Sequence, residues 1–211
     1  MTSSANYARY DDEKLISLIA QAQTEALDQL YERYNRSIFS LALMIVGDRA
    51  TAEEVTLDVF MRVWQKADSY RADQAKVSTW LTHITRHHAI DVLRRRAVRL
   101  DQFALRLEEI TYAVSVRAQD PGELAEHSLR SQRVREAITQ LPVDQKQTLL
   151  LAYFGGYTHT EIAQILKQPL GTIKTRLRLA MQKLRDFLRD EQESENKSAQ
   201  AVNTYNNTEE D

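Results

Sequence analysis

The segment that decides the fold is YTHTEIAQILKQPLGTIKTRLRLAMQKLR, residues 157–185. Apolar residues recur at helical spacing in two runs, first Ile162, Ala163, Ile165 and Leu166, then Ile173, Leu177, Ala180, Met181 and Leu184. The second run leaves polar and basic residues on its other face: Lys174, Thr175, Arg178 and Gln182, with Arg176 nearby. This pattern predicts a helix-turn-helix, whose second helix enters the major groove of DNA. The alternative is a helical hairpin that packs on a protein partner.

The composition predicts an all-α protein. Five glycines and three prolines in 211 residues are too few for a loop-rich β-fold. The absence of cysteine excludes a disulfide scaffold, a thiolate zinc site and a cysteine nucleophile. No apolar run approaches the roughly 20 residues that span a bilayer, and the N-terminus lacks the pattern of a secretory signal. We therefore expect a cytoplasmic protein without membrane insertion.

The pattern along the chain predicts two small helical domains, a linker and a tail. The first domain, residues 11–98, is a four-helix bundle, with a first helix capped by Asp11 or Asp12 and further helices near 24–46, 50–67 and 77–98. Residues 99–128 are acidic, contain Pro121-Gly122 and read as a linker. The second domain, 129–189, has helices near 130–140, 143–154, 159–167 and 171–189. The Glu-, Asn-, Gln- and Ser-rich residues 190–211 predict a disordered acidic tail.

Charge is distributed unevenly along the chain. Residues 71–100 hold 7 basic and 2 acidic side chains, which gives +5, and residues 160–189 also hold 7 and 2. Acidic stretches surround both basic segments, although the whole chain has a net charge of only −2. Two basic patches of matched size favour a polyanionic partner. The alternative is that each patch is a solvated helix face.

The first basic patch lies on the predicted helix 77–98. At about 100° per residue, one sector holds Val77, Leu81, Ile84, His88 and Val92, and the opposite sector holds His83, Arg86, His87, Ile90 and Arg94. A basic helix with flanking aromatic residues such as Trp80 can hold single-stranded DNA through phosphate contacts and base stacking. The alternative is that the tryptophan belongs to the core and that the basic face is solvated.

Motifs of catalysis and metal binding are missing. His83 and His87 have the spacing of metal ligands on a helix, but the zinc-protease pattern needs Glu where Ile84 stands, and Asp91 offers no clear third ligand. Glycine-rich phosphate loops, nucleophile elbows and kinase signatures do not occur. We therefore expect no enzyme activity, no catalytic residue, no metal and no cofactor.

Three segments together resemble the extracytoplasmic-function (ECF) sigma factors of the sigma-70 family. LYERYNRSIFSLALMIVGDRATAEEVTLDVFMRVWQ, residues 30–65, is similar to region 2.1–2.2 of that family. STWLTHITRHHAIDVLRRR, residues 78–96, is similar to region 2.3–2.4. LPVDQKQTLLLAYFGGYTHTEIAQILKQPLGTIKTRLRLAMQKLRDFL, residues 141–188, is similar to region 4. The helix-turn-helix alone would fit many regulators, whereas the combination is specific.

The resemblance implies an alternative sigma factor that binds core RNA polymerase and directs promoter-specific initiation. Region 2.2 would dock on the clamp helices of the largest polymerase subunit through Glu53, Glu54, Thr56, Asp58, Val59, Phe60, Arg62, Val63 and Trp64. For the apolar half of this set, the alternative is a role in the core. Further partners implied by the resemblance are the polymerase flap, promoter DNA and an anti-sigma factor.

The resemblance also assigns the DNA contacts. Region 2 would open the −10 element and hold the non-template strand, with the loop 70–78 capturing a flipped base, through Tyr70, Arg71, Lys76, Trp80, His83, Arg86, His87, Ile90, Arg94 and Arg95. Region 4 would read the −35 element as duplex through Thr160, Gly171, Thr172, Lys174, Thr175, Arg176, Arg178 and Gln182. The competing functions are a free-standing helix-turn-helix regulator and an adaptor that uses the bundle for docking.

The sequence departs from the family pattern at two positions. His87 stands where the family often has Asn, and Lys167 stands in the turn of the helix-turn-helix where the family often has Gly. A left-handed conformation costs lysine roughly 1 kcal/mol more than glycine. The sequence therefore predicts a turn at Lys167 that is either altered or slightly strained.

Overall fold

The computed structural model describes residues 7–95 and 133–206, with side chains described as far as residue 189. Regular structure within these two ranges is helical, which confirms the all-α prediction. The chain divides into two compact units, Met1–Arg106 and Leu107–Asp211. The predicted linker, 99–128, and the last residues of the predicted tail, 207–211, lie outside the described residues.

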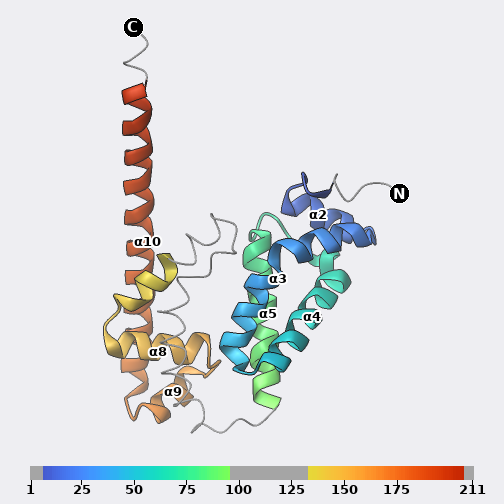
Figure 1. The fold of residues 1–211 in the computed structure, drawn as a ribbon. Helices are drawn as coiled ribbons and strands as arrows, with labels where there is room; N and C mark the ends of the chain where they lie inside the picture. The colour runs from blue at the N-terminus through green and yellow to red at the C-terminus, as the bar shows by residue number, and fades with distance from the viewer. Residues whose placement is uncertain (1–6, 96–132, 207–211) are drawn as a thin grey trace. The chain divides into compact units, whose positions relative to one another are not determined.

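The first unit is a helical bundle built around α3 (Figure 1). Its elements are α2 (Asp12–Ile19), α3 (Thr24–Val46), α4 (Arg49–Lys66), the short 3-10 helix η1 (Ala67–Ser69) and α5 (Val77–Arg95). Helix α3 packs against α2, α4 and α5, and α4 packs against α5. The core includes the fully buried side chains of Leu15, Leu30, Ile45, Val59 and Leu81. The predicted helices are present, and their ends differ by few residues.

The helix ends follow from local chemistry. Asp11 accepts a hydrogen bond from the backbone N–H of Lys14 and caps α2, and Asp48 caps α4 in the same way through the N–H of Thr51. Such caps satisfy N–H groups that have no partner within the helix. Helix α3 ends at Gly47, whose φ of 75° is a left-handed conformation that glycine adopts without steric cost.

The N-terminal segment is fastened to α3 by a small polar cluster. Arg33 donates to Asp12 at 2.8 Å and to the backbone oxygens of Ala8 and Tyr10 at 3.0 and 2.7 Å. The hydroxyl of Tyr34 donates to the other oxygen of Asp12. Burial and the neighbouring Asp12 carboxylate raise the pKa of Tyr34, because both disfavour the charged phenolate. The cluster ties α2 to the bundle.

The second unit contains the predicted helix-turn-helix. After helical residues 133–139 it comprises α8 (Val143–Tyr153), α9 (His159–Ile165) and α10 (Leu170–Asn206), with α10 packed against both α8 and α9. Thr158 and Glu161 form a reciprocal capping box at the start of α9. Leu150, Ile162, Ile173 and Ala180 are buried between the helices. Figure 1 shows α10 as the long C-terminal helix of this unit.

One prediction for this unit differs from the structure. Met181, expected in the core, is 51% exposed, because Ala180 takes the inward position at that level of α10. Helix α10 is traced to Asn206, and its described side chains end at Arg189, directly before the predicted tail. The residues after Arg189 include Glu, Gln, Lys and Ala and contain neither Gly nor Pro before Asn206, so nothing in their propensity ends the helix.

The turn between α9 and α10 is strained at Lys167. Its φ is 50°, which lies in the left-handed region. This conformation costs lysine more than glycine, and the sequence predicted such strain because Lys167 stands where the family often has Gly. We expect Lys167→Gly to raise the free energy of unfolding by about 0.5–1 kcal/mol, since relief of strain exceeds the added entropy of the unfolded chain. Urea unfolding measures the change. Lys167→Ala, which keeps the strain, should bring no gain, and a destabilised glycine variant would contradict this interpretation.

Candidate nucleic-acid interface

The first candidate surface lies on α9 and the N-terminal turns of α10. Gly171, Lys174, Thr175, Arg178 and Gln182 are exposed on α10, and Thr160 is exposed on α9, whereas Thr172 is half-buried. Ile173 and Ala180 point into the core and fix which face of α10 is outside. A Cβ added at Gly171 would meet no atom within 4 Å, so the packing of the chain itself does not require glycine there. The exposed residues of α10 among them thus share an open, basic helix face.

Arg176 differs from its predicted neighbours on α10. It is half-buried, and its guanidinium pairs with Asp144 of α8 at 2.5 Å. The side chain of Asp144 is 63% exposed, so the ion pair contributes about 1 kcal/mol at most to the stability of the fold. Its geometry links α8 and α10, which makes Arg176 a structural residue in the free protein rather than an open cation.

The second candidate surface is the polar face of α5 with the loop before it. His83, His87, Arg94 and Arg95 are exposed, and Arg86 is half-buried. In the loop, Lys76 is exposed and Arg71, also exposed, donates to the backbone oxygen of Asp68 at 2.9 Å. These predicted residues therefore line one face, with cations at both ends of the helix.

An aromatic pair stands where the loop joins α5. The rings of Tyr70 and Trp80 lie 5.3 Å apart at 56°, and both side chains are half-buried. The Tyr70 hydroxyl donates to the backbone oxygen of Ala75 at 2.8 Å, which closes the loop on itself. Burial raises the pKa of Tyr70, with smaller contributions from Glu13 and Asp12 of α2. The pair offers a partly open apolar surface beside the basic face.

The prediction that Ile90 is exposed on this face is wrong. Its side chain is only 7% exposed. The buried positions of α5 shift around the helix along its length, from Val77 and Leu81 to Ala89, Ile90 and Leu93. The sequence analysis assigned one fixed angular sector of the helix to the core over all of its turns, and a fixed sector cannot represent that shift. Ile90 therefore supports the C-terminal half of α5 from inside.

His83 and His87 form a close pair on the exposed face, with ring centroids 4.2 Å apart. Partial burial lowers the pKa of His87, and the nearby His83 and Arg86 lower it further. His87 is therefore neutral at pH 7 and offers a ring and a hydrogen bond rather than a charge. Among the described residues, no group of three or more His, Cys, Asp or Glu side chains could hold a metal ion.

The lowered pKa of His87 gives a direct test. We expect its NMR titration midpoint below 6.5, the ordinary pKa of histidine. Because His87 gains charge only as pH falls through that midpoint, acidification should strengthen binding of single-stranded DNA to this face, and His87→Asn should reduce the gain. A midpoint at or above the ordinary value would contradict the assigned environment.

The face of α4 requires a larger correction. Of the nine residues expected to contact polymerase, Glu53, Glu54 and Asp58 are exposed, and Arg62 and Trp64 are half-buried. The other four lie inside the bundle with at most 5% exposure: Thr56, Val59, Phe60 and Val63. Phe60 packs on the ring of Tyr31 at 4.8 Å. Their side chains belong to the core and support the surface without forming it.

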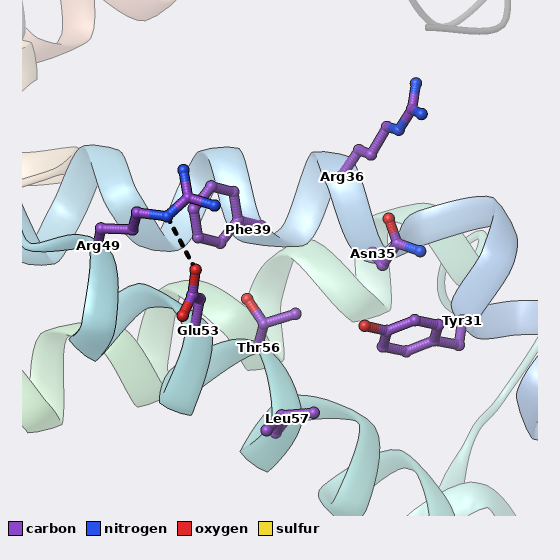
Figure 2. A pocket seen from close by; sticks show the side chains of 8 residues that line it. All are labelled: Tyr31, Asn35, Arg36, Phe39, Arg49, Glu53, Thr56 and Leu57. Carbon is purple, nitrogen blue, oxygen red and sulfur yellow. Dashed lines mark hydrogen bonds and ion pairs between the residues drawn. The ribbon is translucent and has the colours of Figure 1, made fainter. Parts of the chain in front are cut away.

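The structure adds two surface residues that the sequence analysis missed. Leu57 and Met61 are 60% and 55% exposed and lie one helical turn apart on α4. Leu57 also borders an open hollow of about 310 Å³ between α3 and α4, together with Tyr31, Asn35, Arg36, Phe39, Arg49, Glu53 and Thr56 (Figure 2). Arg49 donates to Glu53 at its rim at 2.9 Å. Leu57 and Met61 lie outside the buried stripe formed by Val55, Val59 and Val63, and that position in the sequence could have indicated their exposure.

The comparisons with known proteins place both units in one family. The sequence matches Sigma-70 region 2 over residues 30–99 and Sigma-70 region 4 over residues 131–184. The ECF RNA polymerase sigma factor SigK of Mycobacterium ulcerans is 31% identical over 183 residues, which cover 85% of this chain and 95% of that protein. The chain belongs to the ECF sigma factors.

This sigma factor is also similar to a second curated protein and to a solved structure. The ECF sigma factor RpoE of Cereibacter sphaeroides is 31% identical over 163 residues, 77% of this chain and 86% of that protein. The solved structure of Rhodobacter sphaeroides SigE in complex with the anti-sigma ChrR is 24% identical, covers 88% of this chain and 99% of that one, and has a TM-score of 0.39.

Membership of the family gives the activity at a coarse level. The chain is an alternative sigma factor that directs transcription initiation together with RNA polymerase and promoter DNA, and sigma factors are initiation factors rather than enzymes. The region 2 match contains α4, α5 and the aromatic pair, and the region 4 match contains α8, α9 and the basic part of α10. Within the described residues, no helix is long and apolar enough to cross a membrane.

Proposed function

We propose that this sigma factor docks on core RNA polymerase through α4, opens the −10 element with α5, and reads the −35 element with α10. The observation that carries the proposal is the presence of two basic helix faces, each held in its own compact unit. Two separate DNA contacts suit a promoter with two separated elements. The sigma factor would act in the cytoplasm and would catalyse no reaction by itself.

The −10 contact relies on α5 and the Tyr70–Trp80 pair. Extruding a base from the duplex costs a few kcal/mol of unstacking, which a pocket and backbone contacts must offset. Base stacking on an aromatic surface returns about 1–3 kcal/mol per base. The half-buried aromatic pair supplies that surface, and Lys76, Arg94 and Arg95 supply exposed cations for the phosphates.

The −35 contact relies on the open face of α10. Lys174, Arg178 and Gln182 carry long polar side chains that can reach base edges. The exposed hydroxyls of Thr160 and Thr175 would contact phosphates. Arg176 would contribute only after leaving Asp144. The free protein therefore presents fewer groove-facing cations than the sequence predicted.

The polymerase contact relies on the exposed edge of α4. Leu57 and Met61 give an apolar centre, and Glu53, Glu54 and Asp58 give an acidic rim. Small apolar centres with charged rims are typical of protein interfaces. The proposed binding site for α4 is the clamp helices of the largest polymerase subunit. Region 4 would contact the polymerase flap. An anti-sigma factor would compete with polymerase for these surfaces.

The competing function is that of a free-standing helix-turn-helix regulator. A gel-shift assay with and without core polymerase distinguishes it from the function of a sigma factor. A regulator binds duplex DNA alone, usually as a dimer on two half-sites. We expect this sigma factor to form a specific complex on promoter DNA only when core polymerase is present. Equal specific binding by the chain alone would favour the regulator.

A further inference from the structure

A buried histidine connects the polymerase-facing helix to the DNA-facing helix. His88 of α5 has a side chain only 5% exposed. Its Nε2 lies 2.8 Å from Oδ2 of Asp58, and its Nδ1 lies 2.9 Å from Nη2 of Arg62, both on α4. Asp58 and Arg62 are one helical turn apart, so the ring spans two successive turns of the helix.

The partners fix the proton on the ring. A guanidinium can only donate, so Nδ1 of His88 accepts from Arg62. The hydrogen of the neutral ring is then on Nε2, which donates to the carboxylate of Asp58. Both ring nitrogens are satisfied, which removes the penalty of burying them.

The two partners of His88 lie at the surface. The side chain of Asp58 is 60% exposed and Arg62 is half-buried, so both charged groups remain within reach of a protein partner. Charged surface side chains lose freedom when a complex forms, and that loss weakens binding. A ring that holds both groups from beneath removes part of this loss before the partner arrives.

We propose that His88 is a positioning residue that orients Asp58 and Arg62 for the docking of core polymerase on α4. The proposal rests on the docking function proposed above. It assigns to α5 a part in polymerase binding that its DNA-facing residues do not have.

The test measures the dissociation constant between purified core polymerase and the fluorescently labelled full chain. Leucine at position 88 fills a similar space without hydrogen bonds, and we expect His88→Leu to raise the constant about tenfold. Glutamine can accept from Arg62 and donate to Asp58, so His88→Gln should stay within about twofold of the parent. An unchanged constant for His88→Leu would overturn the proposal.

A second comparison separates positioning from folding. In a chain that carries Asp58→Ala and Arg62→Ala, His88→Leu should change the dissociation constant by less than about twofold, because its partners are gone. A tenfold effect that persists there would show that His88 acts through the fold and would overturn the proposal. If the parent chain itself does not bind core polymerase, the docking function fails first, and the two failures are thereby distinguished.

The ring itself gives a measurement that needs no variant. Imidazole ¹⁵N NMR of the full chain at neutral pH should show the hydrogen of His88 on Nε2. A hydrogen on Nδ1 would exclude acceptance from Arg62 and would overturn the arrangement even if His88→Leu fails to fold.

Discussion

Leu57→Asp is expected to weaken the binding of core polymerase by about 30-fold, the largest single effect on docking. The few hot-spot residues at the desolvated centre of an interface each cost about 2 kcal/mol or more when truncated, and Leu57 is proposed as one of them. Leu57 is 60% exposed in the free chain, so the change should leave the bundle folded. Pull-down or anisotropy with purified core polymerase measures the loss, and the melting temperature checks the fold.

Gln65→Asp is the matched control for this docking variant. Gln65 is exposed on the same helix, beyond the residues assigned to docking, and the substitution adds the same charge. It should leave polymerase affinity within about twofold of the parent, because a substitution outside the assigned interface removes none of its contacts. Equal losses for Leu57→Asp and Gln65→Asp, or no loss for either, would remove this edge of α4 as the docking surface.

Lys174→Ala and Arg178→Ala are expected to weaken promoter recognition through region 4. A lost base contact costs about 1–3 kcal/mol and relaxes the preference at one base pair, whereas a lost phosphate contact weakens all sequences alike and lowers the salt slope by about one. Holoenzyme binding to −35 variants at several salt concentrations separates these outcomes.

Arg176→Ala provides the internal comparison on the same helix. Its guanidinium is engaged with Asp144, so its removal should affect duplex affinity less than Lys174→Ala or Arg178→Ala. If all three variants bind DNA like the parent, the face of α10 assigned to the groove is wrong. If Arg176→Ala has the largest effect, the ion pair opens on DNA and the ranking must be reversed.

The helices could be predicted because their signals are local. Asp11 marks the start of the first helix through its own side chain, and it is found in that role. The left-handed turn at Lys167 was likewise visible as a departure from glycine. Periodicity over one helix placed most core positions, as the buried Val77, Leu81 and His88 show.

The surface could be predicted only in part, because exposure depends on neighbours distant in sequence. Phe60 and Leu57 are both apolar residues of α4, yet Phe60 packs on the ring of Tyr31 whereas Leu57 is 60% exposed. Ile90 is buried because of how neighbouring helices pack against α5, and a helical wheel of α5 alone does not include that packing. The His88 cluster joins residues 26 and 30 positions apart, which no spacing rule connects.

The measurement that tests the central claim most directly is the sequencing of transcript 5′ ends made from genomic DNA of the source organism by core polymerase with and without this chain. The account predicts discrete new start sites that appear only with the chain and share two short motifs at a fixed spacing. It also predicts that Leu57→Asp suppresses all of them, whereas Lys174→Ala changes their ranking. Start sites identical to those of core polymerase alone would contradict it.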